Sequence, residues 1–87
     1  MSRIEVTVRC YGAVRERVGE RSVTLSVREG ASVADALAAL AERSPGFDPD
    51  DDLFVLRDGE HLSVEERRTS ELVEATTLSV SDPVGRE

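Results

Sequence analysis

The chain has 87 residues and carries 18 acidic residues against 11 basic ones, which gives a formal net charge of −7. This length predicts one domain with a small core, and the negative charge repels phosphate backbones and so argues against nucleic-acid binding. Neither a membrane span nor an internal disulfide is expected, because no apolar run approaches the roughly 20 residues of a membrane helix and Cys10 is the only cysteine.

The composition also bears on where the protein works. Every base is arginine, and excess acid without lysine is typical of a protein from a salt-loving (halophilic) source, although a GC-rich genome would equally favour arginine. Strand-like alternation begins at Arg3, which leaves no room for a signal peptide, so we expect a cytoplasmic location. We also expect the chain to be a monomer.

Alternating side chains predict two strands at the start of the chain, over residues 3–10 and 22–28, because every second side chain is apolar. The connection over residues 11–21 fits a single helical turn that ends at Gly19. The apolar positions of the two strands are Ile4, Val6, Val8, Cys10, Val23, Leu25 and Val27.

The pattern then changes to that of a helix. Ser32 is a suitable N-cap, and Asp35 occupies the capping-box position three residues later. Pro45 and Gly46 end the helix, whose alanines raise its helix propensity. The apolar residues that recur at helical spacing are Val33, Ala36, Leu37, Leu40 and Ala41.

Short elements follow the helix. Residues 47–52 are expected to form an acidic loop, and the apolar run of residues 53–56 a buried strand. The dipeptide Asp58-Gly59 predicts a tight turn, so residues 61–62 return as a short strand. Residues 63–74 are polar, and their Ser-x-x-Glu start is compatible with one helical turn.

A last strand over residues 76–80 completes the order strand, strand, helix, strand, short strand, strand. A hairpin, a crossover helix and further strands predict an α+β fold, in which one main helix packs on one face of a sheet.

Four segments of the chain carry a resemblance to a known family: residues 11–19, 30–37, 55–60, and 78–80 with Pro83, Val84 and Gly85. They resemble the ubiquitin-like sulfur carriers and small archaeal modifier proteins of the MoaD/ThiS family, which include the small subunit of molybdopterin synthase. The resemblance implies a ubiquitin-like β-grasp, with a mixed sheet of four to five strands whose first and last strands lie parallel at the centre. We expect a single β-grasp domain over residues 1–81 and a C-terminal tail over residues 82–87.

The tail carries the function that the resemblance implies. In the family it reads roughly Phe-Pro-Pro-Val-x-Gly-Gly, and an adenylyltransferase related to ubiquitin-activating enzymes couples its terminal carboxylate to AMP. Sulfur transfer then gives a thiocarboxylate, or an amine attacks to give an isopeptide bond. By resemblance, Pro83 and Val84 would guide the tail into the activating enzyme, and Gly85 would be the reactive end. The implied partners are this adenylyltransferase or the large subunit of a synthase.

The tail departs from the family pattern in two places. Ser81 and Asp82 stand where the family has Phe-Pro, which removes an aromatic anchor and places a charge where the family tail packs against its partners. Gly85 is a single glycine followed by Arg86-Glu87, so the terminal carboxylate lies beside a bulky acidic side chain. We therefore expect poor adenylation of the chain as written, with trimming after Gly85 as one route to an activatable end.

Two further functions stay open. A chain that has lost its activatable tail would be a β-grasp binding module, acting as a regulatory or structural partner. A third interpretation is a subunit of a larger enzyme. Catalysis by the chain itself is not expected, because it has one histidine, no Ser-His-Asp set and no glycine-rich phosphate loop, and no cofactor is implied.

Two single residues are expected to be structural. Cys10 ends the apolar face of the first strand, so a buried thiol is favoured over a sulfur relay or a thioester acceptor. His61 follows a tight turn and is expected at the surface or at a strand edge.

Two charged segments are expected to be solvated. A calcium-binding loop needs a glycine at its sixth position and a glutamate at its twelfth, where this chain has Leu53 and Gly59. No metal site is therefore predicted, although a weak cation site at high salt stays open. The run of charges over residues 65–68 is expected to be a turn with local ion pairs. The acidic residues of the loop are Asp48, Asp50, Asp51 and Asp52.

Overall fold

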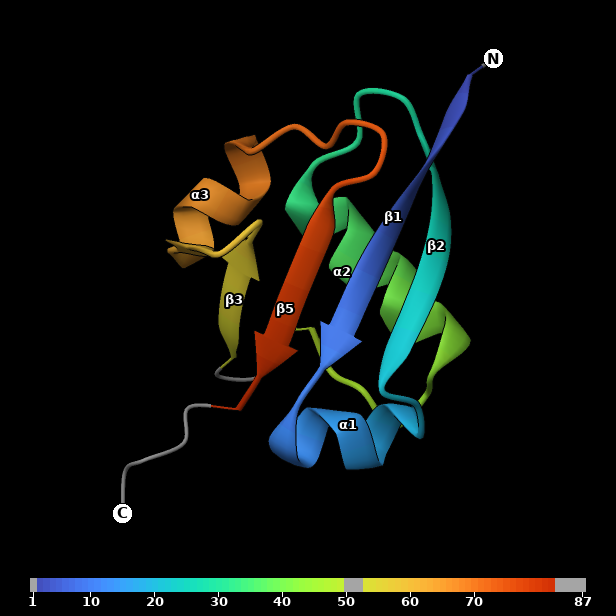
Figure 1. Ribbon diagram of the computed structural model, residues 1–87, viewed down its shortest axis with the longest axis vertical. Coiled ribbons are helices and arrows are strands. Elements are labelled where there is room, and N and C mark those ends of the chain that lie inside the picture. The colour runs from blue at the N-terminus through green and yellow to red at the C-terminus, as the bar shows by residue number, and fades with distance from the viewer. Residues whose placement is uncertain (1, 50–52, 83–87) are drawn as a thin grey trace.

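Eight elements make up the computed structural model, which describes residues 2–49 and 53–82 (Figure 1). In chain order they are β1 (Arg3–Cys10), α1 (Gly12–Val18), β2 (Ser22–Arg28), α2 (Val33–Arg43), β3 (Phe54–Arg57), β4 (Glu60–Leu62), α3 (Val64–Thr69) and β5 (Thr77–Ser81). The strands of the described residues form one mixed sheet with the order β2-β1-β5-β3-β4. The predicted α+β fold is confirmed.

The first and last strands lie side by side inside the sheet. β1 pairs with β5 in parallel, from Thr7 opposite Thr77 to Cys10 opposite Val80. β2 runs antiparallel to β1 on one side, and β3 and β4 continue antiparallel on the other. Because parallel strands have their carboxyl ends at the same edge, β1 and β5 both end near α1 (Figure 1). This is the arrangement that the resemblance implied.

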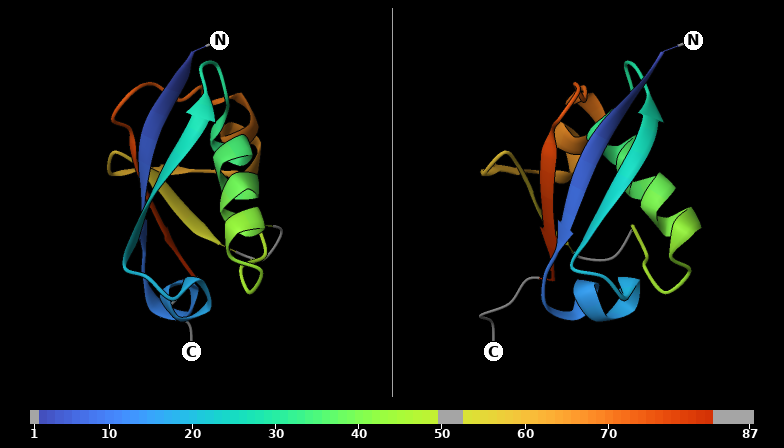
Figure 2. Two further views of the ribbon diagram at one scale, coloured as in Figure 1. Left: turned by 90° about the vertical axis from the view of Figure 1, so that its right-hand side faces the viewer. Right: turned by 45° about the vertical axis from the view of Figure 1, so that its right-hand side comes forward.

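Helix α2 covers one face of the sheet, and α3 packs beside it (Figure 2). The predicted capping box is present: the Ser32 side chain accepts a hydrogen bond from the Asp35 N–H, and the Asp35 carboxylate accepts one from the Ser32 N–H. All predicted inward positions of the first two strands and of the helix are buried, except Ala41, which is half-buried. The strands and α2 therefore share one apolar core.

The connection between β1 and β2 is more helical than the sequence indicated. Instead of a single turn it forms α1, which buries Val14 against the sheet. As expected, the helix ends at Gly19, whose φ of +87° is the left-handed conformation and whose N–H donates to the Arg15 carbonyl at 2.8 Å. Glycine adopts this conformation without the steric cost that a Cβ brings.

Two predictions for the second half of the chain need correction. Phe54 does not belong to a buried run, because β3 alternates: Val55 faces the core and Phe54 is 43% exposed on the opposite face. The charged residues 65–68 lie in α3 and are exposed as expected, except Arg67, which is buried, with Nη2 donating to the Leu53 carbonyl at 2.8 Å. The helical turn expected after Ser63 is confirmed, with a capping box to Glu66.

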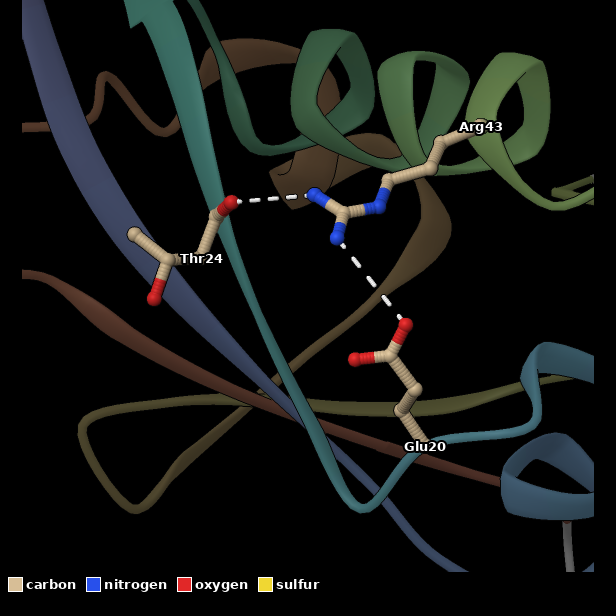
Figure 3. A network of polar contacts seen from close by, with 3 residues as sticks. All are labelled: Glu20, Thr24 and Arg43. Atoms are coloured by element: carbon tan, nitrogen blue, oxygen red, sulfur yellow. Dashed lines mark hydrogen bonds and ion pairs between the residues drawn. The ribbon is translucent and has the colours of Figure 1, made fainter.

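An arginine of α2 covers part of the edge strand β2 (Figure 3). Arg43 Nη1 donates to the Thr24 carbonyl at 3.3 Å, and Nη2 lies 3.9 Å from Glu20 Oε2. Unpaired backbone groups on an edge strand invite pairing with another chain, so Arg43 occupies one acceptor that such a chain would use. None of the helices in the described part of the chain is long and apolar enough to cross a membrane.

Candidate functional site

The site that the resemblance indicates begins where β5 ends. Ser81 is the last residue of β5 and Asp82 follows it, and we call these two residues the tail root. Pro83, Val84 and Gly85, the predicted tail residues, lie outside the described residues. The structure therefore describes the end of the folded domain, at the tail root, from which the tail starts.

The tail root is attached to strands on both sides of β5. On one side, Ser81 lies opposite Phe54 of β3. On the other, the Tyr11 N–H, directly after β1, donates to the Val80 carbonyl at 3.0 Å. The tail therefore leaves from the interior of the sheet, close to α1, rather than from an edge strand.

The Asp82 side chain caps helix α1. The N-cap residue of this helix is Tyr11, which makes no side-chain hydrogen bond to the helix. Asp82 Oδ1 instead accepts a hydrogen bond from the Ala13 N–H at 2.9 Å, across 69 positions of sequence. A carboxylate near a helix N-terminus is also stabilised by the helix dipole. From the sequence, the charge of Asp82 was expected where the family tail packs against its partners. In the structure, the Asp82 carboxylate instead binds the Ala13 N–H of the same chain.

Gly12 makes room for this contact. Its φ is +57°, and a Cβ placed on it would overlap the Asp82 carboxylate. Any other residue at this position would meet both the strain of the left-handed conformation and a collision with Asp82. Gly12, Ala13 and Asp82 therefore form one unit, which ties the tail root to α1.

An exposed aromatic pair, Phe54 and His61, lies beside the tail root. Their strand neighbours Val55 and Leu62 face the core, so the pair lies on the opposite face of the sheet, which no helix of the described residues covers (Figure 2). The ring centroids of Phe54 and His61 are 4.6 Å apart. Phe54 is the residue opposite Ser81, the position at which the family tail has its aromatic residue. Exposed aromatic side chains often anchor protein–protein contacts. The neighbouring strand thus supplies, close to Ser81, the kind of side chain that the tail lacks.

Cys10 is buried at the end of β1, as predicted. Burial raises the pKa of its thiol above the usual range, and the negative charge of Glu20 adds to this rise. A raised pKa keeps the thiol protonated and therefore unreactive near neutral pH. The arrangement favours a structural role for Cys10 over a relay of sulfur.

The raised pKa predicts a loss of stability at alkaline pH. The folded state holds the thiol neutral, so its contribution is fully present below the ordinary thiol pKa of about 8.5 and is lost as the pH rises through the raised folded value. We expect the free energy of unfolding, measured in urea, to fall over this range, and to fall less in Cys10→Ala. Because the chain has no lysine and one tyrosine, few other groups titrate there. An identical decline in both proteins would contradict the prediction.

Of the remaining candidates, only part can be compared with the structure. His61 is exposed on the edge strand β4, as predicted. Asp50, Asp51 and Asp52 of the acidic loop lie outside the described residues. Among the residues that are described, no group of three or more His, Cys, Asp or Glu side chains could hold a metal ion.

Two features of the site were missed by sequence reasoning. No local pattern could indicate the Asp82 cap, because its partner Ala13 lies at the other end of the chain. The exposure of Phe54 could have been predicted, because successive side chains of a strand point to opposite faces and Phe54 precedes Val55. The apolar residues around it suggested instead that the strand is buried on both faces.

Comparisons with known proteins agree with this geometry. The model of the ThiS family matches residues 8–85. The solved structure of SAMP1 from Haloferax volcanii has a TM-score of 0.80 at 24% identity, covering 95% of this chain and 99% of that chain. The small archaeal modifier protein 1 from Methanosarcina acetivorans has a TM-score of 0.78 at 20% identity, with 100% of both chains covered.

A designed protein based on ubiquitin has a TM-score of 0.59 at 19% identity, covering 99% of this chain and 96% of that chain. At these identities the likeness to solved structures shows the fold, a ubiquitin-like β-grasp. No curated protein matches the chain by sequence.

Proposed function

Because this chain belongs to the ThiS family, we propose that it is a ubiquitin-like carrier or modifier that acts through its C-terminal tail. Its partner is an adenylyltransferase of the ubiquitin-activating type, or the large subunit of a synthase. Gly85 is the reactive end, and Pro83 and Val84 guide the tail into the partner. The catalytic groups belong to the partner, and the chain contributes an activatable carboxylate.

The proposed chemistry is a nucleotidyl transfer. A carboxylate oxygen of Gly85 attacks the α-phosphorus of ATP, and the bond from that phosphorus to the pyrophosphate leaving group breaks. The resulting acyl adenylate is attacked at its carbonyl carbon by a sulfur or amine nucleophile, which releases AMP. Glycine suits this end because it has no Cβ and passes through a narrow channel.

The observation that carries the proposal is that the family likeness runs through the tail and does not stop at the sheet. The Asp82 hydrogen bond supports it, because the tail then starts from a defined point on the body. The three residues that follow Asp82, ending at Gly85, span at most about 10 Å when extended. The activating site must therefore lie close to the tail root.

The chain as written must first lose Arg86-Glu87. Hydrolysis of the peptide bond between Gly85 and Arg86 exposes the Gly85 carboxylate and removes the acidic side chain of Glu87 from its neighbourhood. The carrier that results ends in Val-Gly rather than Gly-Gly. We propose this trimmed form as the working form of the protein.

Exchange of labelled pyrophosphate into ATP tests the proposal, with the adenylyltransferase of the same organism. Three chains are compared: the full-length chain, a chain that ends at Gly85, and a chain with Gly-Gly in place of Arg86-Glu87. We expect little exchange with the first and clear exchange with the other two. The intact mass of the protein from its native cells should end at Gly85, with one oxygen replaced by sulfur or with a conjugated protein.

The contrary result is a native mass that ends at Glu87 with no adduct, together with no exchange for any of the three chains. That result would favour the second candidate, a β-grasp binding module that keeps the fold without an activatable tail. The single glycine followed by Arg86-Glu87 is the observation that favours this candidate.

A further inference from the structure

A small cavity with a basic lining lies beside the tail root. Its volume is about 150 Å³, and it forms where the end of β1, helix α1 and the residue before β2 meet. The residues that line it are Arg9, Cys10, Tyr11, Arg15 and Arg21. Three arginines around one cavity are unexpected on a chain whose net charge is −7.

The three arginines of this cavity, which we call the arginine cluster, are exposed. Among the described residues, none of the three guanidinium groups has a hydrogen-bond acceptor or an ion-pair partner. Other arginines of the chain differ: Arg57, for example, donates to Ser70 Oγ at 2.7 Å. Within residues 2–49 and 53–82, nothing therefore occupies the guanidinium donors of the arginine cluster, and we treat them as donors for a ligand.

Nearby carboxylates are directed elsewhere. Glu20 lies close enough to Cys10 to raise the pKa of its thiol, but its Oε2 is 3.9 Å from Arg43 Nη2. Asp82 accepts its hydrogen bond from Ala13. Glu16 follows Arg15 on α1, and consecutive side chains of a helix point about 100° apart. The positive charge of the cluster is therefore not neutralised by an ion pair with any of these groups.

We propose that the arginine cluster binds carboxylate side chains of the protein that receives the tail. Guanidinium groups bind carboxylates through two parallel hydrogen bonds, which fixes both position and orientation. An acidic partner surface is repelled by most of this acidic chain and attracted at the cluster, so the contact selects one orientation of docking. The proposal rests on the proposed function, because it concerns the partner that activates the tail.

Position supports the choice of this partner. Tyr11, which lines the cavity, donates its N–H to the Val80 carbonyl, next to Ser81 of the tail root. Since Gly85 lies within about 10 Å of Asp82, a protein that binds the end of the tail must also cover the surface around the tail root. The arginine cluster lies in that surface, and a nucleic acid is a poor alternative occupant for a chain of this net charge.

Charge reversal tests the proposal. A chain that ends at Gly85 and carries Arg15→Glu and Arg21→Glu is compared with one that carries Arg28→Glu and Arg68→Glu. The control pair has the same change of charge, and its arginines are exposed at the far end of β2 and in α3. In pyrophosphate exchange, the first pair should raise the KM for the chain by about tenfold and leave kcat within about twofold of the parent. The control pair should change neither.

Salt gives a second readout. Between about 0.1 M and 1 M NaCl the Debye length falls from about 10 Å to about 3 Å, so the difference in KM between the two pairs should shrink. Equal KM values for the parent and the first pair, or equal increases for both pairs, would overturn the docking proposal alone. Absence of exchange with the parent chain would overturn the proposed function, and the docking proposal with it.

Discussion

Pyrophosphate exchange should fall by about 100-fold or more when Gly85 is replaced by alanine in a chain that ends at residue 85. Under the proposed function, the added methyl group stands next to the carboxylate that attacks ATP, in a channel that must admit an extended backbone. Displacing this carboxylate by about 1 Å from its line of attack is enough for a loss of that size. The assay compares initial exchange rates at saturating ATP.

Gly19→Ala is the matched control for this change. It adds the same methyl group at the far end of α1, where a Cβ would meet no atom within 4 Å. It should leave the exchange rate unchanged at a temperature where both variants are folded. A Gly85→Ala chain that supports normal exchange would show that the end of the tail is not the reactive group, and would favour a binding module.

Gly12→Ala should lower the free energy of unfolding by about 3 kcal/mol. About 1–2 kcal/mol of this comes from placing a Cβ in the left-handed conformation, because φ is +57° at this position. The rest comes from displacing Asp82 and losing its hydrogen bond to Ala13, on the order of 1 kcal/mol or more for a charged acceptor. Urea unfolding followed by circular dichroism measures the change.

Two comparisons separate these contributions. Gly19→Ala carries the backbone strain alone, because φ is +87° and the space around its Cβ is empty; it should cost about 1–2 kcal/mol. In an Asp82→Ala background the collision is absent, so Gly12→Ala should cost no more than Gly19→Ala does. A double-mutant cycle with no coupling between Gly12 and Asp82 would contradict the proposed unit at the tail root.

The elements that local pattern determines were predicted to within a residue or two. β1 and β2 follow strict alternation, and α2 has both an apolar stripe and a capping box, so sequence and structure agree there. The parallel pairing of β1 and β5 is different, because it joins opposite ends of the chain and came from the family resemblance alone. The division into a domain over residues 1–81 and a tail stays a prediction.

The errors arise where tertiary contacts override local character. Arg67 is in a run of charges, yet it is buried because its guanidinium reaches the Leu53 carbonyl beneath α3. Asp82 looked like a surface charge because its partner is 69 positions away. The arginine cluster likewise could not be anticipated, because its members come from β1, α1 and the residue before β2, and only the folded chain brings them together.

The central place of β5 has a consequence for how this domain folds. The strand that fills the middle of the sheet follows all the other described elements in the sequence, and its parallel partner β1 precedes them. Until β5 joins the sheet, β1 and β3 each lack a neighbour and the apolar core is incomplete. Pairings between distant parts of a sequence also form slowly. We therefore expect β5 to join the sheet late in folding, and the hydrogen bond from Ala13 to Asp82 to form with it.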